Sequence, residues 1–338
     1  MRIVAALGGN ALLQRGERPD AAVQLRHVHQ AARSLAELVE AGHELVITHG
    51  NGPQVGLLAA ESEADPALTV PYPLDVLGAQ TQGMIGTLLA RELMGRLPGR
   101  AVAAVVTHTE VDPRDPAFRQ PSKFIGGQLA EAQARSMETE RGWTTARDGD
   151  RLRRTVPSPL PVAVSEVPVV RTLLAAGTVV IAGGGGGVPV IRDTDTGLLH
   201  GAEAVVDKDL TAALLAEQLD ADALLILTDV THVFTGFGSS RPCPLLTATP
   251  AQLRALDLPE GSMRPKVEAA AAFTERTGGL AAIGPLDNAL GILLGTTGTT
   301  VRAHAEEDGE SKASPEGTAA PGDGHAAHHD LLLLGKEF

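Results

Sequence analysis

Cysteine, aromatic residues and positive charge are all scarce in this chain of 338 residues. The single cysteine, Cys243, excludes an intramolecular disulfide framework and fits a reducing cytosol, and the lack of cysteine pairs argues against a structural zinc site. Aromatic residues make up 2% of the chain, so aliphatic side chains must fill the core. The formal net charge of −13 argues against a nucleic acid or an anionic membrane as partner, because both need a basic surface.

Long hydrophobic runs are also missing. No apolar stretch approaches the roughly 18 residues that a membrane span needs. The apolar segment at the N-terminus is broken by Gly8-Gly9 too early for a secretory signal. We therefore expect a soluble, cytoplasmic protein.

Short apolar segments of strand length alternate with segments of helical period along most of the chain. This alternation is typical of βαβ units and predicts an α/β fold with an open, mostly parallel central sheet. The segments expected as strands are 3–7, 44–48, 101–107, 178–182 and 223–228, and those expected as helices are 21–41, 74–94 and 209–219.

Two segments depart from this pattern. Residues from about 112 to 161 are polar, punctuated by proline and locally rich in basic residues, which predicts a small lid inserted into a main domain spanning 1–301. Residues 302–338 combine Gly, Pro, Ala, Ser and charge without any period, which predicts a disordered acidic tail. The histidines of this tail are not expected to bind a metal, because no other ligand is fixed near them.

Glycine-rich turns follow three of the expected strands. In an open parallel sheet, ligands bind outside the carboxyl ends of the strands, and glycine lets backbone N–H groups approach an anion closely. A helix that begins just beyond such a turn adds its free amides and its dipole. The sequence therefore predicts a phosphate-rich site formed by three turns, which are Gly8-Gly9-Asn10, Gly50-Asn51-Gly52 and Gly183–Gly187.

The common nucleotide-binding motifs are absent. The chain has no Walker A loop, since its one Gly-Lys pair is Gly335-Lys336, and the five-glycine turn does not fit the G-x-G-x-x-G dinucleotide fingerprint. Phosphoryl transfer needs positive charge around the transferring group, so Lys123, Lys208 and Lys266 stand out as candidates. Spacing alone favours a solvated surface position for each of these lysines.

Several longer strings, taken together, resemble the carbamate kinases of the amino-acid kinase superfamily. The most specific are Thr-His-Gly-Asn-Gly-Pro-Gln-Val-Gly at 48–56 and Leu-Gly-Ala-Gln-Thr-Gln-Gly at 77–83. Others include Glu-Ala-Val-Val-Asp-Lys-Asp-Leu at 203–210 and Pro-Lys-Val-Glu-Ala-Ala at 265–270. The resemblance extends over residues 1 to about 301.

This resemblance implies a three-layer αβα sandwich, usually a homodimer, that binds ATP or ADP and carbamate or carbamoyl phosphate on adjacent sites. It implies direct in-line phosphoryl transfer within arginine metabolism, physiologically forming ATP from ADP and carbamoyl phosphate. It also implies Mg²⁺ held mainly by the nucleotide phosphates, without a dedicated protein site.

The resemblance assigns the substrate-binding roles to residues of the turns and their neighbours. Those implied to hold the transferring phosphoryl group are Gly8, Gly9 and Asn10. Those implied on the carbamoyl side are Gly50, Asn51 and Gly52. Those implied at the nucleotide are Gly183, Gly184, Asp229 and Lys266.

It assigns the catalytic roles to three lysines and a carboxylate. Lys123 would reach in from the lid, and Lys208 would bridge phosphates. Asp207 would orient these lysines, while Lys266 would contact the nucleotide phosphates. The list contains no nucleophile or general base, which suits transfer between two bound substrates.

Three features differ from the family pattern. Phe124 stands where the family usually has proline after the lid lysine, Arg264 stands where the family tends to have a small residue, and the segment 230–238 differs from the usual Val-Tyr-Leu-Asn-Tyr/Phe-Gly pattern. Two alternatives stay open: a kinase of another small carboxylate or phosphonate acceptor, and a catalytically silent module that binds nucleotide or carbamoyl phosphate. The presence of all three lysines together with all three turns favours an active enzyme.

Overall fold

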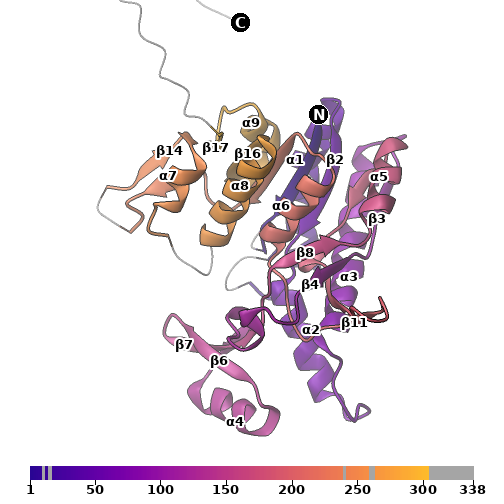
Figure 1. Ribbon diagram of the computed structural model, residues 1–338, viewed down its shortest axis with the longest axis vertical. Helices are drawn as coiled ribbons and strands as arrows, with labels where there is room; N and C mark the ends of the chain where they lie inside the picture. Colours follow the sequence, from indigo (N-terminus) through magenta and orange to yellow (C-terminus); the bar gives the residue numbers. More distant parts are fainter. Residues whose placement is uncertain (10–11, 14–16, 239–240, 259–262, 304–338) are drawn as a thin grey trace, which may run out of the picture. The chain divides into compact units, whose positions relative to one another are not determined.

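An eight-stranded sheet forms the centre of the protein (Figure 1). A computed structural model of the chain describes residues 1–9, 12–13, 17–238, 241–258 and 263–303. From one edge to the other, the strands are β15 (Thr247–Ala248), β17 (Thr299–Val301), β16 (Leu280–Pro285), β12 (Ala223–Thr228), β1 (Arg2–Leu7), β2 (Glu44–His49), β9 (Val179–Ile181) and β3 (Val102–Ala104). Every neighbouring pair runs parallel except β16 and β17, so the prediction of an open, mostly parallel sheet is confirmed.

Helices cover both faces of this sheet. Alternate residues of β1 enter different cores: Ile3 packs with one set of helices and Val4 with another, as the two-residue period of a strand requires. The helices on the Ile3 face are α1 (Ala21–Glu40), α3 (Leu74–Arg96) and α9 (Ala289–Leu293). Those on the Val4 face are α5 (Val167–Ala175), α6 (Lys208–Gln218), α7 (Pro250–Arg254) and α8 (Met263–Thr277). The three-layer αβα sandwich is therefore confirmed.

The strand expected at 101–107 is the one that differs most from its prediction. Only Val102–Ala104 forms a strand, and its residues are partly exposed rather than buried. It lies at the edge of the sheet and pairs with β9 alone, so it has a partner on one side only. Helix α2 (Gly52–Ala64), which begins at the last residue of the second glycine turn, was not predicted.

Two smaller sets of strands flank the central sheet. A mixed sheet has the order β11 (Leu199–Gly201), β10 (Val188–Arg192), β4 (His108–Val111) and β8 (Pro161–Val164). A hairpin joins β13 (Val233–Thr235) to β14 (Cys243–Leu245). Short 3₁₀ helices are η2 (Pro116–Phe118), η3 (Gly184–Gly186) and η4 (Leu286–Asn288).

A separate antiparallel sheet occupies the segment predicted as a lid. Its strands are β5 (Lys123–Leu129), β7 (Arg151–Val156) and β6 (Thr144–Asp148), in that order, with helix α4 (Glu131–Arg141) between β5 and β6. These elements lie together at the lower end of Figure 1. We call them the lid, and the bounds expected for it, about 112–161, stay a prediction.

The lid is attached to the main domain at its base. Ile125 and Val156 of the lid are buried in one apolar cluster with Val55 and Ala59 of α2. Beside them the backbones of Gly56 and Gly126 approach so closely that a Cβ built on Gly56 would lie 2.0 Å from the Cα of Gly126. Only glycine at position 56 permits this contact.

No helix in the described part of the chain is long and apolar enough to cross a membrane. Disorder was predicted for residues 302–338. Of these, residues 304–338 lie outside the described part of the chain.

Candidate active site

The three glycine turns lie side by side. They follow β1, β2 and β9, which are consecutive neighbours in the parallel sheet, so all three turns meet at the carboxyl edge. A Cβ on Gly50 would lie 2.9 Å from the Cα of Gly9, which shows that the first two turns are in contact. Gly9 and Gly52 have open space where a side chain would stand. Asn10 lies outside the described residues.

A cluster of lysines and carboxylates adjoins these turns. Asp207 caps helix α6, and its Oδ1 accepts a hydrogen bond from the backbone N–H of Asp209 over 2.9 Å. Its other oxygen pairs with the ammonium group of Lys123, which comes from the lid. The side chain of Lys208 lies 3.4 Å from the position of a Cβ on Gly50, so the cluster borders the second turn directly.

Asp209 joins the remaining two lysines. One carboxylate oxygen pairs with Lys208, and the other lies 3.2 Å from Nζ of Lys266. The structure therefore brings Lys123, Lys208 and Lys266 together, although they come from the lid, α6 and α8. Sequence reasoning assigned no role to Asp209; its place in the Asp-Lys-Asp string was the available signal.

Burial distinguishes this cluster from surface ion pairs. Lys208 is 8% exposed and Asp209 is 2% exposed. The surface position that spacing favours for Lys208 is thus wrong, because Asp209 provides the partner that makes burial of an ammonium group tolerable. A buried cation beside open glycine turns is suited to bind an anion.

The protonation of the cluster follows from its charges. Burial would raise the pKa of Asp209, but Lys208 and Lys266 outweigh it and hold this pKa below its ordinary value. Burial would likewise raise the pKa of Asp207, and Lys123 and Lys208 reverse that effect. Burial lowers the pKa of Lys208, while the pKa of Lys266 ends above its ordinary value because Asp209 and Asp207 offset burial.

Asp229 and Asn51 lie at two further positions around the site. Asp229 follows β12 and accepts a hydrogen bond from the hydroxyl of Thr228 over 3.0 Å, and its charge helps to raise the pKa of Lys266. The buried Asn51 donates from Nδ2 to Oγ1 of Thr81 on α3 over 2.8 Å. The contact of Asn51 with Thr81 thus ties the second turn to helix α3.

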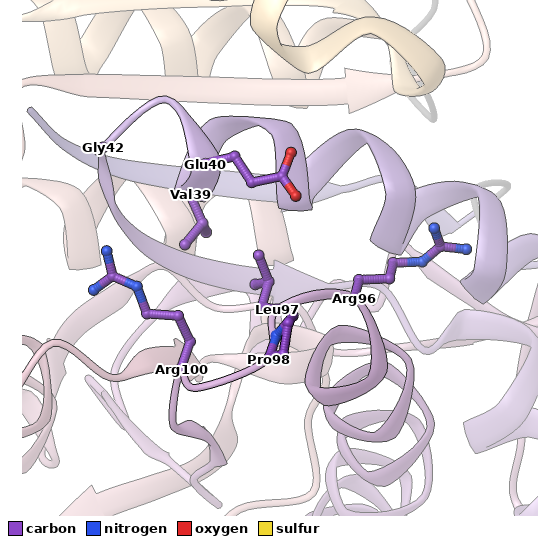
Figure 2. A pocket seen from close by; sticks show the side chains of 7 residues that line it. All are labelled: Val39, Glu40, Gly42, Arg96, Leu97, Pro98 and Arg100. Carbon is purple, nitrogen blue, oxygen red and sulfur yellow. The ribbon is translucent and has the colours of Figure 1, made fainter.

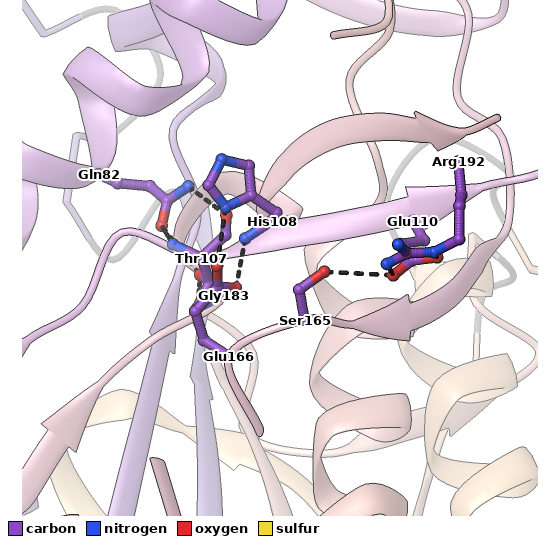
Figure 3. Close-up of polar contacts among 8 residues, drawn as sticks. All are labelled: Gln82, Thr107, His108, Glu110, Ser165, Glu166, Gly183 and Arg192. Atoms are coloured by element: carbon purple, nitrogen blue, oxygen red, sulfur yellow. Dashed lines mark hydrogen bonds and ion pairs between the residues drawn. The ribbon is translucent and has the colours of Figure 1, made fainter. Parts of the chain in front are cut away.

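A network of hydrogen bonds that was not predicted from the sequence holds the third turn, Gly183–Gly187, in place (Figure 3). The backbone N–H of Gly183 donates to Oγ1 of Thr107 over 2.6 Å. Oε1 of Gln82, on α3, accepts from both the N–H and the hydroxyl of Thr107 over 3.0 Å each. Beside it, the N–H of His108 donates to Glu166, whose other oxygen lies 2.7 Å from His108 Nδ1. The N–H of Gly183 is therefore already used, and the nucleotide roles of Gly183 and Gly184 stay predictions.

One surface hollow of about 250 Å³ lies at the other edge of the sheet (Figure 2). Its lining comes from the end of α1 and from the loop after α3, ahead of strands β2 and β3. The residues are Val39, Glu40, Gly42, Arg96, Leu97, Pro98 and Arg100. This hollow is at the amino ends of the strands and is not the predicted substrate site.

His49, at the end of β2, provides a test of the packing beneath the turns. Burial lowers its pKa from 6.5 to about 4, and Nδ1 lies 3.0 Å from the carbonyl oxygen of Gly50. Between pH 6.5 and 4, the unfolded chain binds a proton that the folded chain does not, so the free energy of unfolding falls as the pH falls. We expect the titration of His49 to lower the free energy of unfolding by about 3 kcal/mol between pH 6.5 and pH 4. Above pH 6.5 this titration should have no effect on stability.

Urea denaturation at steps from pH 7 to pH 4 measures this effect. The His49→Asn variant should show a flatter dependence of unfolding free energy on pH than the wild type, whatever its stability at pH 7. Parallel curves for the two proteins would contradict a neutral, buried His49.

The model of the amino acid kinase family matches residues 1–283, and the chain belongs to that family. The carbamate kinase of Haemophilus influenzae is 45% identical over 307 residues, which cover 90% of this chain and 98% of that protein. The carbamate kinase of Escherichia coli K12 is 46% identical over 299 residues, covering 88% and 98%. Within the family, the chain therefore belongs with the carbamate kinases.

Solved structures agree with this relationship. Carbamate kinase from Giardia lamblia bound to AMP-PNP is 35% identical and superimposes with a TM-score of 0.80, covering 89% of this chain and 98% of that one. The same protein bound to citric acid is 36% identical, with a TM-score of 0.82 and coverage of 89% and 98%. The fold expected from the resemblance is thus confirmed.

Proposed function

We propose that the chain is a carbamate kinase that transfers a phosphoryl group reversibly between ATP and carbamate. The observation that carries this proposal is the set of three lysines, paired with two aspartates and including the buried Lys208, at the edge where the glycine turns meet. The AMP-PNP bound by the Giardia relative supports an ATP site in this fold. The same edge would then hold both substrates.

The proposed transfer is direct. Gly8, Gly9 and Asn10 would cradle the transferring group, with Gly50, Asn51 and Gly52 on the carbamoyl side. Ammonium groups fixed in a water-poor site stabilise the charge that develops on the phosphoryl oxygens, and they need no reorganisation during the reaction. Lys208 is the best placed of the three, because it is buried and borders the second turn.

The carboxylates keep the lysines in place before substrates arrive. Asp207 holds Lys123, and Asp209 holds both Lys208 and Lys266. Gly183, Gly184, Asp229 and Lys266 would face the nucleotide. We propose these roles on the basis of proximity to the glycine turns and of family resemblance.

Mg²⁺ is proposed to bind together with ATP or ADP. The donor set fits a metal held mainly by phosphate oxygens, because the carboxylates of Asp207 and Asp209 are already paired with lysines. When bound, the ion would neutralise phosphate charge. The homodimer and the cytoplasmic location stay predictions from the resemblance and the composition.

ATP formation from ADP, Mg²⁺ and carbamoyl phosphate tests the proposal. The purified protein should form ATP rapidly with carbamoyl phosphate and far more slowly with acetyl phosphate, a carboxyl phosphate that lacks the amino group. Faster reaction with acetyl phosphate would indicate another acceptor. Binding of ADP without any ATP formation would indicate a silent module.

A further inference from the structure

Besides the pair of Lys123 with Asp207, a second ion pair outside the lysine cluster links the lid to helix α2 of the main domain. We propose that Arg154 and Glu63 are positioning residues that fix the lid on helix α2 and thereby hold Lys123 at Asp207. The proposal rests on the proposed function, and it adds two residues that neither touch the turns nor belong to the lysine cluster.

Arg154 occupies the central strand of the lid and reaches across to α2. Its Nη1 donates to Oε1 of Glu63 over 3.1 Å, and the two side chains are only 19% and 15% exposed. Its guanidinium group also lies over the ring of Trp143, 4.3 Å from the centroid. A half-buried guanidinium group held between a carboxylate and an indole has a defined direction, unlike a solvated surface pair.

Electrostatics indicate that the main domain stabilises this cation. Burial lowers the pKa of Arg154, while the charges of Glu63 and Glu203 act in the opposite sense. Glu203 itself accepts a hydrogen bond from the N–H of Leu74, the first residue of α3, over 3.0 Å. Loss of Glu63 would therefore leave a partly buried cation without its nearest carboxylate.

The register of the lid sheet connects this pair to the catalytic lysine. Lys123 is opposite Val156, and Ile125 is opposite Arg154, on the same two strands. Arg154 and Lys123 are thus two ladder positions apart, or about 7 Å along the strands. A lid that rotates away from Glu63 carries Lys123 with it.

Two attachment points are needed to define the orientation of the lid. The first is the base of the lid, where Gly56 meets Gly126 beside an apolar cluster, and this contact is close but carries no directional interaction. Glu63 lies seven residues further along α2, about 10 Å away along the helix axis. The ion pair at this distance resists rotation about the glycine contact.

The test compares two carboxylates on the same helix. Glu63→Gln removes the charge that faces Arg154, whereas Glu61→Gln makes the same chemical change at an exposed position two residues earlier. We expect Glu63→Gln to lower kcat for ATP formation about tenfold to a hundredfold, with KM for ADP nearly unchanged, because a displaced group loses its alignment. Glu61→Gln should match the wild type in both constants.

The single tryptophan of the chain provides a readout that does not depend on activity. Acrylamide should quench the fluorescence of Trp143 more strongly in Glu63→Gln than in the wild type or Glu61→Gln, because the face toward α2 opens. The quenching measurement remains informative even if the wild type forms no ATP. Absence of ATP formation would contradict the proposed function but not the positioning of the lid. Unchanged quenching in Glu63→Gln would overturn the positioning role.

A double variant separates positioning from general destabilisation. If Glu63 acts through Lys123, Glu63→Gln should have no further effect on kcat in a Lys123→Met background. If Glu63→Gln lowered kcat by the same factor in the wild type and in Lys123→Met, the proposal would be overturned. Thermal unfolding of each variant ensures that only folded protein is compared.

Discussion

Lys208→Met should lower kcat for ATP formation by a factor of about 10² to 10³. Methionine keeps much of the length and apolar volume of the lysine stem but removes the buried cation that borders the second glycine turn. Loss of one preorganised charge that contacts the transition state typically costs about 3–4 kcal/mol. Steady-state kinetics with ADP and carbamoyl phosphate measure the effect.

A matched control removes a cation from another helix. Arg276 lies near the end of α8 and pairs with Glu217 at the surface. It is ten residues beyond Lys266, about 15 Å along the helix axis. Arg276→Met should keep wild-type activity. If Lys208→Met kept it as well, Lys208 would have no role in the transfer.

Asp209→Asn should cause the largest loss of stability, about 3–5 kcal/mol in the free energy of unfolding. The carboxylate of Asp209 is 2% exposed and is paired with two lysines. Its removal leaves Lys208 and Lys266 close together without the negative charge that compensates their burial, and unpaired buried charges carry a penalty of this size. Urea denaturation followed by circular dichroism measures the change.

Asp220→Asn is the corresponding control. Asp220 lies just beyond the same helix, where its carboxylate is 76% exposed and pairs with Arg171. Exposed pairs of this kind contribute about 0–1 kcal/mol. Equal losses in the two variants would show that the buried pairing of Asp209 has no special weight.

The layout of the main domain was predictable because it depends on local signals. Apolar runs located β1, β2 and β12, and the glycines after β1, β2 and β9 located the turns that meet at one edge. Parallel strands necessarily bring their carboxyl ends to the same edge, so the meeting of the three turns followed from the alternation of elements. The length of the strand expected at 101–107 was overestimated. Apolar character does not show where an edge strand stops pairing with its neighbour.

The charge pairing could not be predicted in the same way. Lys266 is 57 residues from Asp209, and Lys123 is 84 residues from Asp207. Their proximity depends on how α8 and the lid pack against α6, which no local pattern encodes. The burial of Lys208 follows from that packing, so a reading from spacing alone placed this lysine at the surface.

Steric crowding around the five-glycine turn restricts which residues can stand in it. At four consecutive positions, Gly184 to Gly187, a methyl group would lie 2.1–2.3 Å from His49, Asn51, Val206 or Thr109. Three of these glycines also have a positive φ, from 65° to 92°. Every single-residue replacement there should be rejected in a mutational library, whether or not the loop touches a substrate. Invariance of this segment would therefore record the tightness of the interior, and it carries no weight as a marker of catalysis.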